Sequence, residues 1–232
     1  MIETSRWSLP APWTALRLCV VIAIATPAAN ASAADLRITV ADSRGQSAAQ
    51  VVVVARPIGA AAAANAAKSA TVTQQFQTFT PGVMPISVGT TVEFPNLDRM
   101  RHHVYSFSPA KTFEIHLYSG EDTPKVTFDV PGVITLGCNI HDWMTGYLYV
   151  TDAPYFAATD EAGIATLRNV PPGEYRLAVW HPKLDAEANE GTTRVGTTPA
   201  TVDLKVAAVI EPIAQHRPDD DPLLVRLRTS KQ

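Results

Sequence analysis

Short alternating segments fill residues 71–152, and they constrain the fold of this chain more than any other feature. In one of them, apolar side chains recur at every second position as Phe113, Ile115 and Leu117, which is the period of a half-buried β-strand. Pro and Gly interrupt these segments, and both residue types mark turns. We find no long amphipathic helical pattern in the 232 residues. The chain is therefore predicted to be all-β.

Strand patterns also lie on both sides of this region. Residues 35–57 contain the alternating Leu36, Ile38 and Val40 and a β-branched run at 51–54, and both patterns predict strands. The Ala-rich segment 58–72 is interpreted as a linker. A further block of strands is predicted in 153–207, where the polar, Gly/Thr-rich stretch 185–198 is expected to be a long loop. The tail 208–232 holds one strand-like segment at 223–227.

The first 33 residues have the pattern of a secretory signal peptide. Arg6 and Arg17 precede an apolar run at 18–25, and residues 31–33 have the small-x-small form of a cleavage site. The run is about half of the ~20 residues that a spanning helix requires. We therefore expect export to the periplasm and no permanent membrane anchor. Cleavage would remove Cys19 and leave Cys138 as the one thiol of the chain.

The segment 137–144 combines three soft ligands at regular spacing. Cys138, His141 and Met144 supply a thiolate, an imidazole and a thioether at positions i, i+3 and i+6, and copper prefers such ligands. A blue-copper site needs two His, one Cys and a weak axial Met, so this segment offers three of the four. Metal ligation also explains an unpaired cysteine in an exported protein, where free thiols are otherwise oxidised or paired.

The missing histidine should come from a neighbouring strand, and the strand-like segment 102–108 is the natural place for it. It begins with His102 and His103. Their side chains must lie on opposite faces, because side chains alternate along a strand. On this pattern alone, either histidine can be the fourth ligand.

Residues 73–152 resemble the small blue copper proteins, the cupredoxins of the plastocyanin and amicyanin type. In that family a ligand His follows a Phe-x-Asn loop, as His102 follows Phe94-Pro95-Asn96 here. The Cys-x2-His-x2-Met spacing is similar to the short ligand loop of amicyanin. Pro131-Gly132 begins the strand leading to the Cys, although aliphatic residues replace two aromatic residues of the family pattern.

The resemblance implies a Greek-key cupredoxin β-sandwich with one type 1 copper. It favours His102 over His103, because the family has the form His-x-Val and Val104 matches it. The implied copper ligands are His102, Cys138, His141 and Met144. Asn96 is implied to join the two ligand loops by hydrogen bonds, which would orient the ligands. A redox partner protein is expected to dock near His141, on an apolar rim formed by Ile140 and Trp143.

Residues 153–207 resemble a second family, the carboxypeptidase regulatory-like β-sandwich of the prealbumin type. The resemblance rests on Thr159-Asp160-x-x-Gly163 and on the later Val-Pro-Pro-Gly-x-Tyr motif at 170–175. In that family such a segment follows strands like those of 35–57, which suggests one small sandwich with the copper domain inserted. Alternatively, 35–57 extends the cupredoxin sheet. The combination is similar to exported proteins described as methylamine-utilisation or plastocyanin-like.

These observations predict an exported mononuclear copper protein that carries single electrons. Two alternatives are a periplasmic copper chaperone or store with the same ligands, and a structural or partner-binding sandwich in which copper is incidental. An enzyme is not expected, because Gly137 and Asn139 flank the Cys where multicopper oxidases have His, and no P-loop or nucleophile elbow is found. The net charge of −3 gives no support for nucleic-acid binding. Glu114 and His116 are interpreted as solvated side chains.

Overall fold

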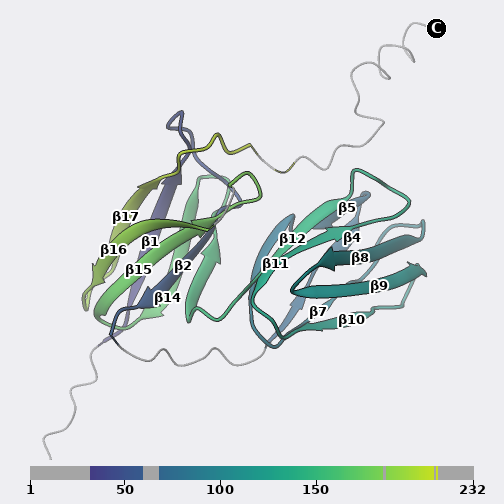
Figure 1. The fold of residues 1–232 in the computed structure, drawn as a ribbon, viewed down its shortest axis with the longest axis horizontal. Helices are drawn as coiled ribbons and strands as arrows, with labels where there is room; N and C mark the ends of the chain where they lie inside the picture. The colour runs from purple at the N-terminus through teal and green to yellow at the C-terminus, as the bar shows by residue number, and fades with distance from the viewer. Residues whose placement is uncertain (1–31, 60–67, 185–186, 212, 214–232) are drawn as a thin grey trace, which may run out of the picture. The chain divides into compact units, whose positions relative to one another are not determined.

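The computed structural model describes residues 32–59, 68–184, 187–211 and 213 (Figure 1). Every regular element within these ranges is a β-strand, so the predicted all-β class is confirmed. In the same ranges, nothing helical has the length and apolar character of a membrane span. The predicted signal peptide lies almost entirely outside the described residues, as does the strand-like segment 223–227.

Residues 69–151 form two sheets and a hairpin around one core. The larger sheet has the order β6 (Val83–Ser87), β12 (Thr145–Thr151), β11 (Gly132–Gly137), β8 (His102–Ser108) and β9 (Lys111–Tyr118). The smaller has the order β10 (Lys125–Phe128), β7 (Thr90–Glu93) and β3 (Ser69–Thr71), and the hairpin pairs β4 (Thr73–Gln75) with β5 (Thr78–Thr80). We call this part the first sandwich.

Alternation along these strands builds the core of the first sandwich. In β11, Ile134 and Leu136 are buried while Thr135 between them is exposed. They pack in one cluster with Phe94, Phe128 and other apolar side chains. Burying a large apolar side chain contributes roughly 1.5–3 kcal/mol, so this core is the main stabilising term of the first sandwich.

The remaining strands form a second sandwich around a separate core. One sheet has the order β14 (Ile164–Val170), β1 (Ala34–Ala41) and β17 (Ala200–Lys205). The other has the order β13 (Tyr155–Ala158), β2 (Val52–Pro57), β15 (Gly173–Trp180) and β16 (Ala188–Val195). Its core includes Leu36, Ile38, Leu167 and Leu177. Because β1 and β2 pair only with strands after residue 153, the first sandwich lies in sequence between two parts of the second.

Two segments differ from the sequence-based expectation. The prediction of a long loop at 185–198 is wrong, because β16 pairs antiparallel with β15 from Ala188 to Val195. The linker expected at 58–72 is too long, because Ser69–Thr71 form β3 and pair parallel with β7. Residues 60–67 of that linker lie outside the described part of the chain.

Strand pairing brings the two predicted ligand segments to one end of the larger sheet. β11 runs antiparallel to β8, with Gly137 opposite Tyr105, and antiparallel to β12, with Gly137 opposite Thr145. The loop 138–144 therefore leaves the sheet beside the start of β8. Gly137 allows this close approach, since a Cβ there would lie 2.7 Å from Cζ of the Tyr105 ring.

Candidate metal centre

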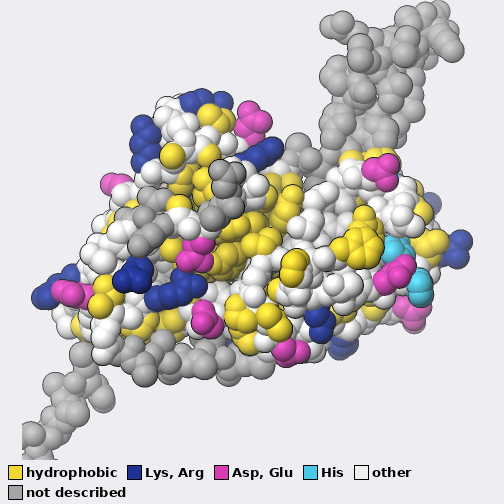
Figure 2. Space-filling model, in the orientation of Figure 1, with side chains coloured by type: hydrophobic (Ala, Val, Ile, Leu, Met, Phe, Trp, Pro, Cys, Tyr) yellow, Lys and Arg dark blue, Asp and Glu magenta, His cyan; other side chains and the backbone are white. Residues whose placement is uncertain are grey.

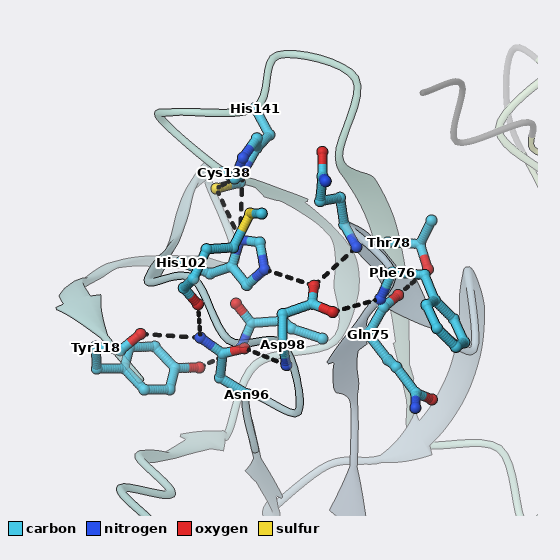
Figure 3. Close-up of polar contacts among 12 residues, drawn as sticks. Gln75, Phe76, Thr78, Asn96, Asp98, His102, Tyr118, Cys138 and His141 are labelled. Atoms are coloured by element: carbon cyan, nitrogen blue, oxygen red, sulfur yellow. Dashed lines mark hydrogen bonds and ion pairs between the residues drawn. The ribbon is translucent and has the colours of Figure 1, made fainter. Parts of the chain in front are cut away.

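Three side chains from two separate segments converge at this end of the sheet (Figure 3). His102 begins β8, and Cys138 and His141 lie in the loop between β11 and β12. The two histidine Nδ1 atoms are 3.2 Å apart. The Cys138 sulfur lies 3.6 Å from Nδ1 of His141 and 4.0 Å from Nδ1 of His102. His102 and Cys138 are buried, and His141 is half-buried.

The shape of this donor triangle fits a metal ion. First-row ions such as Zn²⁺ bind nitrogen at roughly 2.0 Å and thiolate sulfur at roughly 2.3 Å. With edges of 3.2, 3.6 and 4.0 Å, the three donors are close enough that all of them could hold one ion at about these lengths. Two imidazoles and one thiolate in a trigonal arrangement are the equatorial set of a blue-copper site.

Met144 lies at the end of the same loop. Its side chain is 1% exposed and belongs to the same buried cluster as Cys138. Its backbone N–H donates to the carbonyl of His141 at 2.9 Å, which closes a turn at the end of the loop. A second methionine, Met100, precedes His102 by two residues and is 42% exposed, and it belongs to none of the motifs described above.

The structure also separates the two adjacent histidines. His102 is fully buried and faces the donor triangle. His103 lies on the opposite face of β8, where its Nε2 lies 2.9 Å from Oε1 of Glu114. The alternation of side chains along the strand therefore gives His102 to the centre and excludes His103 from it.

Asp98 is a member of the site that sequence reasoning missed. Its Oδ2 lies 2.8 Å from Nε2 of His102, the ring nitrogen that faces away from Cys138 and His141 (Figure 3). Histidines that bind metals commonly donate the other ring N–H to a carboxylate, which fixes the tautomer and raises the basicity of the ligand. The contact thus leaves Nδ1 of His102 free to act as a metal ligand.

The Asp98 carboxylate is held in turn by the β4–β5 hairpin. Its two oxygens accept the backbone N–H groups of Phe76 and Gln77, both at 2.8 Å. These two turn residues have φ values of 56° and 58°, as a tight two-residue hairpin turn requires. Residues other than Gly or Asn rarely adopt this conformation, and such local strain is commonly found at functional sites.

Asn96 differs from the expectation that it joins the two ligand loops. Its Nδ2 donates to the carbonyls of Met100 and Tyr118, each at 2.9 Å, and its Oδ1 accepts the N–H of Asp98 at 3.0 Å. Within the described residues these bonds tie the 96–100 loop to the end of β9 and do not reach the loop 138–144. Asn96 therefore positions Asp98, and through it His102.

The surroundings of the donors set their protonation. Burial opposes ionisation of Cys138, but the His102 side chain and the backbone N–H groups of His103 and Ile140 outweigh it and lower the thiol pKa. Burial likewise opposes the charge on His102, but Cys138 and Asp98 raise its pKa. Burial and then the His102 charge lower the pKa of His141. Without a metal the pocket thus favours a Cys138 thiolate paired with a protonated His102, beside a neutral His141, and a metal that binds must displace the His102 proton.

Two apolar side chains flank His141 in the ligand loop. Its ring centroid lies 5.1 Å from that of Trp143, and Ile140 is 47% exposed. The predicted rim beside His141 is therefore present.

Comparisons with solved structures find copper proteins. A Cu-containing nitrite reductase from Thermus scotoductus is 29% identical over 41% of this chain and 25% of its own, with a TM-score of 0.35. A purple cupredoxin from Nitrosopumilus maritimus is 24% identical over 35% of this chain and 99% of its own, with a TM-score of 0.32. A reduced amicyanin variant is 21% identical over 40% and 87%, with a TM-score of 0.33.

No protein-family model and no curated protein sequence matches the chain. The matched segment spans only a quarter of the nitrite reductase chain. Since the likenesses cover about two fifths of this protein at low TM-scores, the donor set itself is the ground for a functional proposal.

Proposed function

We propose that the first sandwich is a Greek-key cupredoxin that holds one type 1 copper, and that the protein carries single electrons. The observation that carries this proposal is the convergence of two imidazole nitrogens and one thiolate sulfur within 4.0 Å of one another. His102, Cys138 and His141 would be the equatorial ligands and Met144 the axial one. Copper at this position would supply a Cu(II)/Cu(I) couple.

The protein part of electron transfer is to keep the ligands fixed while the charge at the centre changes. Both ring nitrogens of His102 have a neighbour that holds them: Nε2 contacts Asp98, and Nδ1 faces His141. Cys138 and Met144 are embedded in the core of the sandwich. Ligands that cannot move need little rearrangement between the two oxidation states, and a small rearrangement favours fast transfer.

His141 is the proposed route by which electrons enter and leave. It is the half-buried member of the donor set, whereas His102 and Cys138 are buried. The rim formed by Ile140 and Trp143 gives a partner protein an apolar surface beside this ring. We propose that a redox partner docks there.

The remaining parts of the proposal concern the rest of the chain. The second sandwich has the two sheets and the strand-turn motif at 170–173 that favour a prealbumin-type, carboxypeptidase regulatory-like module. The signal-like pattern of the first 33 residues supports export to the periplasm.

The thiolate ligand provides the sharpest test. The full chain loaded with Cu²⁺ should show an intense visible band from charge transfer between thiolate and Cu(II). Cys138→Ser should abolish the band while the far-UV circular dichroism stays the same, because Ser fits the same space without a thiolate. A colourless protein that binds only Zn²⁺, or colour that persists in the variant, would contradict the proposal.

A copper chaperone or store is the second candidate, and one observation favours it. Met100 and a separate cluster of two histidines and a glutamate lie near the centre at the surface, and extra exposed ligands suit copper traffic. Voltammetry and competition with a copper chelator distinguish the two. A carrier gives a reversible wave and releases copper slowly, whereas a chaperone gives up copper quickly and shows no reversible wave.

A further inference from the structure

A second group of metal-binding side chains lies on the outer face of the larger sheet. Val104 of β8 is paired with Ile115 of β9, and both side chains face the core. Alternation therefore places His103, Glu114 and His116 together on the other face. Figure 2 shows histidine and acidic side chains (cyan and magenta) together on the surface of the molecule, beside hydrophobic side chains.

The three side chains are close enough to share one ion. Oε1 of Glu114 lies 2.9 Å from Nε2 of His103 and 3.5 Å from Nδ1 of His116. One ligand atom of each residue lies within 4.8 Å of the other two. Donors bound at roughly 2.0 Å to a common ion are about 3–4 Å apart, so the cluster needs only small side-chain adjustments.

The setting of His103 indicates more than a chance surface contact. Its side chain is 8% exposed, and its Nδ1 is buried without a hydrogen-bond partner among the described residues. Among the described residues, this buried ring makes its polar contact through Nε2, which faces Glu114. Burial of the ring and the 2.9 Å contact hold Nε2 towards Glu114, which is the orientation that a shared ion needs.

The cluster opens into a hollow, so further coordination positions face solvent. The hollow is lined by the three side chains and by Leu117, Asn139 and Ile140. Two of these, Asn139 and Ile140, lie between the proposed copper ligands Cys138 and His141. The cluster thus adjoins the first centre through this loop and through the peptide bond from His102 to His103.

We propose that His103, Glu114 and His116 form a second metal site for a borderline divalent ion such as Zn²⁺ or Cu²⁺. Two imidazoles and a carboxylate suit these ions, and the absence of a thiolate from the three disfavours Cu(I). In the metal-free protein the Glu114 carboxylate lies between the two histidines, and in the metal-bound protein it becomes a ligand. The site does not depend on copper at the first centre.

Zinc titration of the full chain tests this site directly. With copper already in the first centre and its visible band recorded, calorimetry with Zn²⁺ should show one further equivalent bound. His116→Ala and Glu114→Gln should each weaken this binding at least about tenfold, since losing even an outer partner of a ligand costs 10–100-fold. Both side chains are exposed, so the fold and the visible band should survive.

Thr112→Ala is the matched control, because Thr112 is exposed on β9 two residues before Glu114 and outside the cluster. It should leave zinc binding unchanged. The proposal is overturned if no saturable zinc binds beyond the first centre, or if both cluster variants bind zinc as the unmodified chain does. If the chain takes no copper at all, loss of one zinc equivalent in His116→Ala but not in His141→Ala still supports the second site.

Discussion

Asp98 shows how much of the site depends on a single carboxylate. It joins the buried His102 ring to two backbone N–H groups of the β4–β5 turn. Sequence reasoning found Cys138 and His141 because their spacing within one loop is visible directly. The role of Asp98 depends on a hairpin about twenty residues earlier, so no local pattern revealed it.

Asp98→Asn should weaken copper binding 10–100-fold, as loss of an outer-shell partner does in other metal sites. The amide keeps the size of the carboxylate but removes its charge, so His102 becomes a less basic ligand and Cu(II) is stabilised less. We therefore expect a higher reduction potential and a visible band that is retained. Competition titration with a chelator and voltammetry measure the two effects.

Asp142→Asn is the control for the charge alone. Asp142 is exposed and follows His141 in the ligand loop. The substitution therefore removes one negative charge near the centre without changing the contact of Asp98 with His102. Equal changes in affinity and potential for both variants would show that the contact between Asp98 and His102 has no special role.

At the scale of elements, strands with apolar side chains at every second position were predicted from the sequence, and β16 was not. Residues 35–41 have an apolar side chain at every second position, and they form β1 with its buried face against the core. β16, at the edge of its sheet, has no such alternation in its sequence Ala-Asn-Glu-Gly-Thr-Thr-Arg-Val. Among the residues of β16 whose side chains are described, Val195 is the one in the buried core. Its pairing with β15 comes from backbone hydrogen bonds, which no side-chain pattern records.

The turn before β14 offers an element-scale test. Gly163 has a φ of +74°, and a Cβ there would lie 2.6 Å from the backbone carbonyl oxygen of Val40 in β1. Gly163→Ala should therefore cost about 1–2 kcal/mol for the left-handed backbone, and about 1–3 kcal/mol more for the clash. The free energy of unfolding from denaturant titration measures the sum.

Gly45→Ala separates the two contributions. Gly45 has a φ of +80° but open space around the added carbon, so only the backbone cost of about 1–2 kcal/mol applies. If the two variants lose the same stability, the contact between the 160–163 turn and β1 is not as tight as the structure shows.

At the scale of the whole molecule, pH should act on stability through His181. This side chain is fully buried, its Nδ1 accepts the N–H of Lys183 at 3.2 Å, and its Nε2 has no partner among the described residues. Burial, and then the charge of Lys183, lower its pKa from 6.5 to about 4. Between pH 6.5 and about 4, His181 is therefore protonated in the unfolded chain and neutral in the folded chain.

The free energy of unfolding should fall as the pH falls from 6.5 towards 4, and the His181 contribution should be level outside this window. The shift corresponds to a loss on the order of 3 kcal/mol. Because carboxylates also titrate at acid pH, the comparison is with His181→Gln, which cannot take up this proton. Denaturant unfolding at pH 7 and pH 4.5 should give a steeper loss for the unmodified chain, and parallel losses would refute the assignment.

The order of the strands also has a consequence for synthesis. β1 and β2 are made before the rest of the described strands, but their partners β13, β14, β15 and β17 follow about a hundred residues later. All strands of the first sandwich are complete at residue 151, before those partners exist. Domains generally fold as units, starting from the N-terminus during synthesis. The first sandwich can therefore fold while β1 and β2 are still unpaired. The first sandwich would then fold first, although it is made later than β1 and β2, and these two strands would be among the last to pair.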